Sequence, residues 1–575
     1  MLYSILLAVA SWKKSIIMIF RPRNEFMQLL WIVVLLLFQH APACAQTAAK
    51  NVDQIVYVNP AHPQASDQNP GSQALPFKTI GRAAAAAGAN NANQVGTKVL
   101  IGAGIYRESI DLPKTGRETD APIVFEAAGE VIVSGSDVWT GWQRATGDNV
   151  WVHAWPYRWG LAPIPSGWEP YVKLKDIVRR SEMVFVNGTP LDQALSHSEL
   201  QAGGFFADEK ARTIYVRLPE GLTADQAVVE VAVRPKLFWA SDKTNIVLRG
   251  IIFQHASTAL DEPAVGFYDS SNILVEDCQF RWNNWGGVGF GRSRNITARR
   301  NEASHNGGTG IGTWKTRTVV FEDNENSHNN RRGVKGGFTG WAVAGMKNLY
   351  MHEGIVLRHK SNDNPTHGIW FDTDCENILV DESVFCSNLE IGIYLEASQG
   401  PITIKNSRVC RNKHYGILIA NSARVNLERN ILYGNAPAQI MVSGYYDSAR
   451  PETNWETGAK MGLLAEQAAW MHNVVVGTET KQFLVSTTLS PPLWRHFVDS
   501  LKSDRNVWFH PQDSTVFQVA GGYRGNFTSW QSTTRQDGNS VFADPRLRDP
   551  AQDDFRLHPD SPFWVMEKGA RGSTR

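Results

Sequence analysis

The sequence has no excess of charge of one sign and few cysteines. Lys and Arg number 57 against 56 Asp and Glu, so no net field would attract nucleic acid or an anionic membrane. Outside the first 45 residues the cysteines are Cys278, Cys375, Cys386 and Cys410. They are too scattered for a disulfide scaffold and include no CxxC pair for zinc. These absences argue against a nucleic-acid-binding protein, a disulfide-rich module and a zinc-binding domain.

The chain also lacks an uninterrupted apolar run of the roughly 20 residues that a membrane-spanning helix needs. A shorter run after Met27 (LLWIVVLLLF) ends in an A-x-A pattern at Ala43 and Ala45, and positive charges precede it. This pattern predicts a signal peptide at residues 1–45, with either a long first region or a later true start codon. A lipid anchor at Cys44 is disfavoured because no Leu stands at the usual upstream position. We therefore expect a secreted or periplasmic protein without a membrane anchor after cleavage.

What the sequence does contain is a repeat, in a composition rich in Gly (48) and Trp (20). Successive segments begin with an apolar residue, and the steps between these are 23, 23, 36, 23, 24 and 23 residues. The lead residues are Ile273, Ile296, Val319, Ile355, Ile378, Ile402 and Val425. Ten residues after each stand Asn283, Asn306, Asn329, then Pro365 as an exception, and Asn388, Asn412 and Asn435. Six Asn at one position predict a structural ladder of side-chain amides.

A period near 23 residues with short β-rich segments is typical of a parallel β-helix, in which stacked coils bury a core that no single coil could bury. A second column of Gly followed by an apolar residue opens another strand in each coil, as at Gly368-Ile369 and Gly392-Ile393. The single long step then places an insertion in a turn near residues 331–344. The predicted fold class is all-β, a right-handed parallel β-helix.

The flanking regions predict appended parts. Residues 46–135 should form an N-terminal cap and the first coils, with a capping helix that begins near Thr79. Residues 136–240 lack the repeat and predict an inserted small β-sandwich. Residues 241–445 would be the central coils. Residues 446–575 should complete and cap the stack, with a helix at 458–473 (GAKMGLLAEQAAWMHN).

Two acidic residues share an outward column of this solenoid. If Ile369 and Ile393 point inward, period-two alternation sends Asp372 and Glu396 outward from adjacent strands. Parallel strands lie about 4.7–4.9 Å apart, so the two carboxyls would be about 5 Å apart, the separation of retaining glycosidases. Like charges in neighbouring strands destabilise a sheet unless they are compensated. The pair therefore predicts catalytic residues, a nucleophile and an acid/base whose pKa its neighbour raises.

Other outward residues suit a carbohydrate. Trp314 shares the column of the acidic pair, and Trp370 and Tyr394 flank it, so their flat rings could stack on sugars. Lys347 lies beside Trp370. Asp374, one outward step beyond the pair, could orient a substrate hydroxyl. We predict these five residues as substrate-binding residues. Packing of the aromatic residues under the 331–344 insertion is the alternative.

The remaining candidates are interpreted as structural. Cys386 and Cys410 share a column, where free thiols and a disulfide between coils are both geometrically possible. His352, His359 and His367 show no metal-binding spacing and are interpreted as ordinary polar residues.

At this point the chain resembles a known family. The segments YVNP…NPGS…PFKTIGRA, AGMK (344–347), GIWFD (368–372), YLEASQGP (394–401) and VFADPRLRDP…DFRLHPDSP resemble right-handed β-helix glycosidases related to the β-helix β-xylosidase family, within the pectate-lyase-like superfamily. The resemblance covers most of the chain after residue 45. It implies that Asp372 is the nucleophile and Glu396 the acid/base.

Three functions compete. The first is a secreted retaining glycoside hydrolase that acts on a plant or microbial polysaccharide or oligosaccharide and needs no cofactor. The second is a polysaccharide lyase on a uronate polymer, in which Lys347 abstracts the proton and calcium is held by Asp372, Asp374 and Glu396. The third is a non-catalytic carbohydrate-binding protein. In each, the partner is a carbohydrate, and fold analogy alone does not choose among them.

Overall fold

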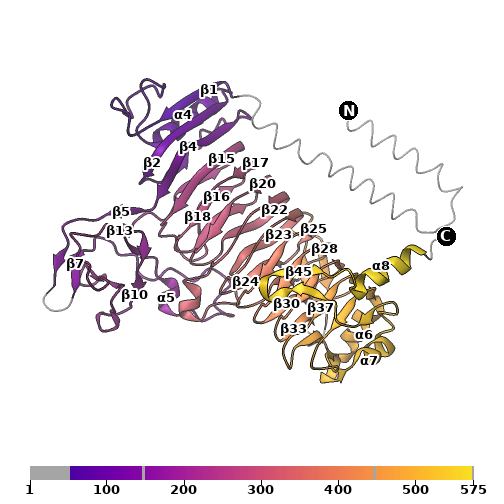
Figure 1. Cartoon of the computed structure of the whole chain (residues 1–575). Coiled ribbons are helices and arrows are strands. Elements are labelled where there is room, and N and C mark those ends of the chain that lie inside the picture. The colour runs from indigo at the N-terminus through magenta and orange to yellow at the C-terminus, as the bar shows by residue number, and fades with distance from the viewer. Residues whose placement is uncertain (1–51, 146–148, 445–447, 573–575) are drawn as a thin grey trace, which may run out of the picture. The chain divides into compact units, whose positions relative to one another are not determined.

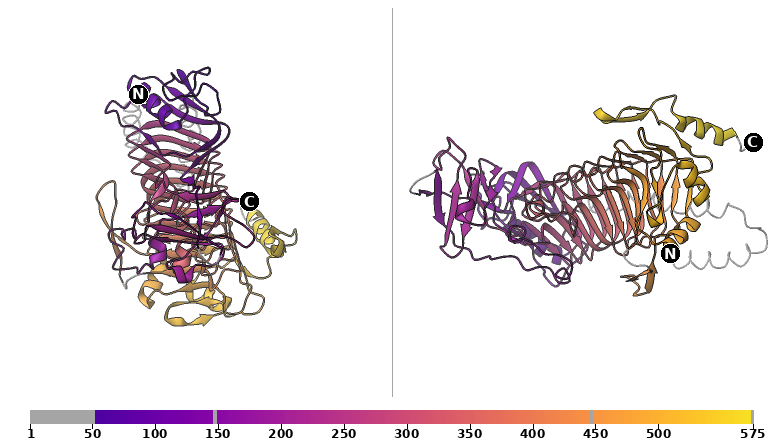
Figure 2. Two further views of the ribbon diagram at one scale, coloured as in Figure 1. Left: turned by 90° about the vertical axis from the view of Figure 1, so that its left-hand side faces the viewer. Right: turned by 90° about the horizontal axis from the view of Figure 1, so that it is seen from below.

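The computed structural model describes residues 52–145, 149–444 and 448–572. The predicted signal peptide at 1–45 lies outside these residues. Most of the described chain forms a parallel β-helix, whose coils stack one on the next from the indigo to the yellow end of the chain (Figures 1 and 2). Within the described ranges, none of the helices has the length and apolar character needed to cross a membrane.

The strands of successive coils pair in parallel and build three sheets along the solenoid. The first sheet contains, in order of pairing, β3 (Ile110–Leu112), β14 (Phe238–Ser241), β16 (Pro263–Tyr268), β19 (Gly286–Gly291), β22 (Ile311–Glu322), β23 (Ala344–Leu357), β24 (His367–Asp372), β27 (Ile393–Glu396), β30 (Tyr415–Ala420), β33 (Ala438–Ser443) and β38 (Phe483–Thr487). Strands β22 and β23 are long enough to continue into the second sheet.

The second sheet contains β1 (Gln54–Val58), β2 (Thr97–Tyr106), β4 (Ile123–Ser134), β15 (Thr244–Gln254), β17 (Ser271–Glu276), β20 (Arg294–Arg299), the ends of β22 and β23, β25 (Glu376–Asp381), β28 (Ile402–Lys405), β31 (Val425–Glu428), β36 (Ala469–Met471) and β39 (Lys502–Asp504). The third contains the ends of β4 and β15, then β18 (Gln279–Arg281), β21 (Glu302–Ser304), β26 (Val384–Cys386), β29 (Arg408–Cys410), β32 (Ile431–Tyr433), β37 (Val474–Val476), β40 (Val507–Phe509) and β43 (Val541–Phe542).

The repeat predicted from sequence is the register of the second sheet, with one correction. Val319 pairs with Gly354, and Gly354 pairs with Ile378. Ile355 lies one residue later and points outward, so its assignment as a lead residue was wrong. Ile355 resembles the apolar lead residues of the other coils. In this coil, however, the inward position is a glycine, which lies beside the Met351 side chain.

The same correction removes the gap in the Asn ladder. The residue ten places after Gly354 is Asn364, not Pro365. Its Oδ1 accepts a hydrogen bond from the backbone N–H of Asn329 (2.9 Å), and its Nδ2 donates to Oδ1 of Asn388 (2.9 Å). The ladder therefore runs without interruption through this coil, and each buried amide satisfies groups of the next coil.

A helix precedes the second coil, as expected near Thr79. Helix α4 (Ile80–Ala92) has Thr79 as its N-cap, whose hydroxyl accepts from the N–H of Arg82 (3.2 Å). The carboxylate of Glu108 accepts from the N–H groups of Ile80 and Gly81, which satisfies donors that a helix start leaves free. Its buried alanine face packs on β2 and β3. Its role as a cap of the solenoid stays a prediction.

The region between the first coils and the central coils contains two small sheets, one short α-helix and a 3-10 turn at His197–Glu199. One sheet consists of β6 (Gln143–Arg144), β7 (Val150–Ala154), β10 (Asp192–Gln193), β11 (Gly204–Asp208) and β12 (Thr213–Arg217), and the other of β5 (Ser136–Val138), β8 (Val184–Val186), β9 (Thr189–Pro190) and β13 (Val229–Ala232). Side chains of both sheets, Ile214 and Val231 among them, contribute to one apolar core. Helix α5 (Asp176–Arg179) lies against the insertion between β22 and β23.

The helix predicted at 458–473 is wrong. This segment forms β35 (Lys460–Leu463), which pairs antiparallel with β34 (Arg450–Thr453), and β36, which continues the second sheet. The coils persist here because Trp470 enters the core and Asn473 continues a ladder of buried amides with Asn430 and Asn506. Helices occur later, at α6 (Pro491–Ser500), α7 (Phe527–Thr534) and α8 (Pro562–Gly572). A short hairpin of β44 (Leu547–Asp549) and β45 (Asp554–Leu557) precedes α8, and β41 (Phe517–Gln518) and β42 (Arg524–Gly525) precede α7.

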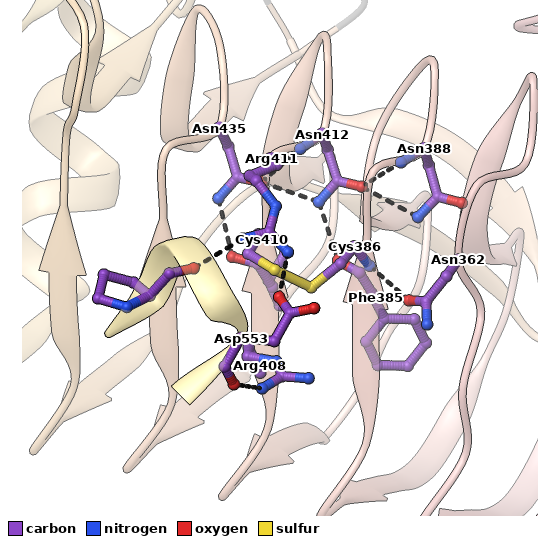
Figure 3. The surroundings of a disulfide bond; sticks show 12 residues. Asn362, Phe385, Cys386, Asn388, Arg408, Cys410, Arg411, Asn412, Asn435 and Asp553 are labelled. Atoms are coloured by element: carbon purple, nitrogen blue, oxygen red, sulfur yellow. Dashed lines mark hydrogen bonds and ion pairs between the residues drawn. A yellow bond between two sulfur atoms is a disulfide. The ribbon is translucent and has the colours of Figure 1, made fainter. Parts of the chain in front are cut away.

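Cys386 and Cys410, whose state the sequence left open, form a disulfide between adjacent coils of the third sheet (Figure 3). The C-terminal hairpin docks beside it. The guanidinium of Arg411 bonds to Asp553, and the Phe555 ring packs on the two cysteines and lies under Arg408. Cys278 and Cys375 are buried thiols.

Candidate functional site

A groove of about 560 Å³ lies on the outward face of the first sheet. Its floor is formed by strands β16 to β27, and part of its wall comes from the inserted region and from the insertion before β23. The lining residues are Trp168, Asp261, Glu262, Pro263, Tyr268, Trp285, Gly286, Val288, Gly289, Phe290, Thr309, Gly312, Thr313, Trp314, Trp341, Ala342, Lys347, Leu349, Trp370, Asp372, Thr373, Glu396 and Arg450.

Asp372 and Glu396 both line this groove and pair directly, as the last residues of β24 and β27. Their inward neighbours, Phe371 and Leu395, are fully buried in the core, so the alternation sends both carboxyls outward. Neighbouring parallel strands are about 4.7–4.9 Å apart, which suits the spacing of about 5–5.5 Å between the carboxyls of retaining glycosidases.

Asp372 is bonded by a cation and a hydroxyl. The ammonium of Lys347 lies 2.7 Å from its Oδ2, and the hydroxyl of Thr373 donates to its Oδ1 at 2.9 Å. Lys347 precedes it in the neighbouring coil, where it pairs with Trp370 in the register. An ion-paired carboxylate in this position is prepared to act as a nucleophile.

Glu396 has a different environment. It is 8% exposed, and its Oε1 accepts a bond from Nη1 of Arg450 at 2.8 Å. Burial and the neighbouring charge of Asp372 raise its pKa, although Arg450 and Lys347 oppose the shift. Two adjacent carboxyls with such different surroundings suit a division of roles between a nucleophile and a general acid.

The predicted aromatic residues divide into two groups. Trp314 lines the groove, half-buried, in the register column of Leu349 and Asp372. Trp370 and Tyr394 are only 4% and 6% exposed. Their rings stack on each other with centroids 4.7 Å apart, and Nζ of Lys347 lies 3.2 Å from the Trp370 centroid.

The expectation that Trp370 and Tyr394 present free faces to a sugar was therefore wrong. Trp370 lies between Lys347 and Tyr394, and Tyr394 has Leu418 as its neighbour on the next strand, in one apolar cluster. These neighbours come from adjacent coils in the same column. The Lys347 ammonium lies over the Trp370 ring, which stacks on Tyr394. This cation–π contact helps to hold Lys347 in position.

Asp374 does not lie in the groove. Its side chain is fully buried, and it accepts from Nε2 of Gln399 (2.7 Å) and from the N–H of Trp455 (2.7 Å). Both Thr373 and Asp374 have positive φ, 51° and 54°, so the strand alternation ends at Asp372. In the described part of the chain no three His, Cys, Asp or Glu residues gather as metal ligands. The calcium set of Asp372, Asp374 and Glu396 was therefore wrong.

Sequence reasoning missed most of the groove wall. Trp168 comes from the inserted region, Trp285 from the turn before β19, and Trp341 from the insertion before β23. Trp341 stacks on Tyr171, with centroids 5.3 Å apart. The residues lie far apart in the sequence and outside the strand columns, so no periodic pattern marked them.

Two further charged contributions were also missed. Arg450 belongs to the β34–β35 hairpin, 54 residues after Glu396. Asp261 and Glu262 come just before β16 and line the groove. Surrounding protein raises the pKa of Asp261 to about 7, against the attraction of Lys347.

Comparison with known proteins supports the architecture. A family model described as "Right handed beta helix region" matches residues 238–346 and 263–454. The chain is a right-handed parallel β-helix protein. It is 27% identical over 190 residues to the uncharacterized protein YwoF of Bacillus subtilis (strain 168), an alignment that covers 30% of this chain. The chain spans 40% of the length of that relative.

A solved structure shares the fold at low sequence identity. The complex of XylC with xylose superposes with a TM-score of 0.62 at 16% identity and covers 79% of this chain and 83% of that one. The A-module of the mannuronan C-5 epimerase AlgE6 of Azotobacter vinelandii gives a TM-score of 0.48 at 12% identity, over 81% of this chain and 96% of the module.

Proposed function

We propose that this right-handed β-helix protein is a retaining glycoside hydrolase, with Asp372 as nucleophile and Glu396 as general acid and base. The observation that carries the proposal is the register of the two residues. They are direct neighbours on adjacent strands at the edge of one groove. Asp372 is paired with Lys347, and Glu396 is paired with Arg450 and buried, with a raised pKa.

In the first step the carboxyl of Glu396 gives its proton to the glycosidic oxygen, and that oxygen leaves with the bonding electrons. An oxygen of Asp372 forms a bond to the anomeric carbon and gives a covalent glycosyl ester. In the second step Glu396 takes a proton from a water, whose oxygen displaces Asp372 from the anomeric carbon. The sugar leaves with its original anomeric configuration, and Glu396 is protonated again.

The groove favours a carbohydrate without negative charge. Its lining includes two cations, Lys347 and Arg450, and both are paired with acids, Asp372 for the first and Glu396 and Glu452 for the second. A polyuronate would have to compete with those acids for its counter-charges. Lys347 is also engaged by Asp372, which disfavours it as the proton-abstracting base of a lyase. A xylose-like neutral sugar suits the aromatic wall, and XylC, of similar fold, was solved with xylose.

The test is a screen of aryl glycosides, β-xyloside included, beside uronate polymers with and without a chelator. We expect hydrolysis of at least one aryl glycoside. ¹H NMR of the released sugar should show that its anomeric configuration is retained, and the chelator should not change the rate. Asp372→Asn should abolish turnover. Asp363→Asn is the matched control, because Asp363 is an exposed turn carboxylate at positive φ that Asn tolerates. An unsaturated, absorbing uronate product would favour a lyase.

We also propose that residues 1–45 are removed during export, on the sequence pattern alone. Sequencing of the N-terminus of the protein recovered from the periplasm or medium should then start at Gln46. A chain that retains residues 1–45 there would contradict this.

A further inference from the structure

The β34–β35 hairpin brings Arg450 into the groove from a distant part of the chain. Arg450 is the first residue of β34. Its Nη1 lies 2.8 Å from Oε1 of Glu396, and its Nε lies 2.9 Å from Oε1 of Glu452 on the same strand. The hairpin is a two-stranded sheet of its own, and such a hairpin is marginally stable unless it packs on other elements. The position of Arg450 therefore depends on what anchors the hairpin.

The anchors lie at the turn of the hairpin, in residues 454–459. The N–H of Trp455 donates to Oδ2 of Asp374 at 2.7 Å. Nδ1 of His352 lies 2.9 Å from Oε2 of Glu456, and the indole of Trp455 lies against the His352 ring, with centroids 5.3 Å apart. Arg317 forms a further ion pair with Glu456.

On the solenoid side, the residues that bind the hairpin turn are held in place by other contacts within the solenoid. Asp374 is fully buried and is oriented by Gln399 through its other oxygen. Nε2 of His352 lies 3.0 Å from the backbone oxygen of Asp374 and 3.3 Å from its Oδ2, and the His352 side chain is 3% exposed. The two residues thus form one buried unit beneath the hairpin turn.

We propose that His352 and Asp374 are positioning residues, which dock the hairpin so that Arg450 contacts the acid/base Glu396. The inference rests on the proposed function, because it assigns Arg450 a role in the acidity of Glu396. It assigns a role to Asp374 and His352, two buried residues that take no part in the chemical step.

The charges around His352 are consistent with this role. Asp374 and Glu456 face it directly, and in the register of the second sheet it lies between Arg317 on β22 and Glu376 on β25. Burial alone would lower the pKa of His352, but the bonds to Asp374 and Glu456 outweigh it and raise the pKa. The protonated form therefore fastens the hairpin most strongly.

The experiment compares wild type with His352→Leu, and with Glu456→Gln as a second variant on the more exposed partner. Hydrogen–deuterium exchange of residues 450–463 is measured first. Loss of the anchor should speed exchange of the hairpin by about tenfold or more, without change in the coils of the first sheet. Lys460→Ala is the control, because Lys460 bonds only to Thr453 within the hairpin in the described contacts.

The pH profile of kcat/KM is measured next. Arg450 opposes the rise in the pKa of Glu396, so Arg450→Gln should move the alkaline limb of the profile to higher pH by about one unit. The two anchor variants should move it in the same direction, whereas simple destabilisation would leave it in place. Unchanged exchange in both anchor variants, or faster exchange with an unmoved limb, overturns the inference. Faster exchange in a protein that hydrolyses no glycoside refutes the proposed function and leaves the anchoring intact.

Discussion

Asn364 offers the sharpest test of the corrected register. In Asn364→Ala the backbone N–H of Asn329 loses its acceptor, because Oδ1 of Asn364 is its partner at 2.9 Å. A buried donor without a partner costs about 1–3 kcal/mol. The bonds from Nδ2 to Asn388 and Ser361 are also lost, at about 0.5–1.5 kcal/mol each. The carbonyl of Asn326 keeps the Ser361 hydroxyl as a donor, so it adds little. We expect Asn364→Ala to lower the free energy of unfolding by about 3 kcal/mol.

Urea unfolding, followed by tryptophan fluorescence and by far-UV circular dichroism, measures this loss if the two signals coincide. Asn426→Ala is the control, since the Asn426 side chain makes one bond, to Thr403 at 3.3 Å in the described contacts, and should lose less than about 1 kcal/mol. If Pro365 occupied the ladder position instead, Asn364→Ala would behave like the control. A loss below about 1 kcal/mol would refute the register.

Three further predictions concern the site. Glu396→Gln should slow turnover of substrates with poor leaving groups by about 10²–10⁴-fold and remove the alkaline limb; equal loss with activated aryl glycosides would contradict an acid role. Gly312→Phe should raise KM without lowering Tm, because a Cβ there meets no atom closer than 4.0 Å, whereas Gly289→Phe should lower Tm because its Cβ would lie 2.8 Å from Pro263. The stability that His352 adds over His352→Leu should be full below about pH 6.5 and decline as pH rises through its raised folded pKa; a difference that grows with pH in urea unfolding would contradict the ion pairs.

The solenoid and the register of Asp372 and Glu396 were predictable because both follow from local rules. A recurring Asn marks a turn whose amides stack, and alternation along a strand fixes which residues point outward. Asp372 and Glu396 could therefore be paired from the spacing of Gly368-Ile369 and Gly392-Ile393, and the pairing is the observed one.

The errors arose where a local rule stopped. Alternation ends after Asp372, because Thr373 and Asp374 both adopt left-handed backbone. The Asp374 side chain is buried and accepts a hydrogen bond from the N–H of Trp455 in the turn of the hairpin. Ile355 matches the apolar lead residues of the other coils, although Gly354 holds the inward position in this coil.

The walls of the groove were not predictable, because they depend on contacts between distant segments. Trp168 and Trp341 come from regions without a repeat, and Arg450 comes from a hairpin in a segment expected to be helical. A periodic pattern in the sequence indicates which side of a strand a residue points to. It does not indicate which distant segment of the chain packs on that side.

The measurement closest to the central claim is the identity of the residue that carries the sugar. A 2-deoxy-2-fluoro glycoside of the sugar found in the screen should trap the covalent intermediate, and mass spectrometry of the digested protein then locates it. The account predicts one glycosyl group, on Asp372, and none in Asp372→Asn. An adduct on another residue, or turnover with inversion and no adduct, would contradict it.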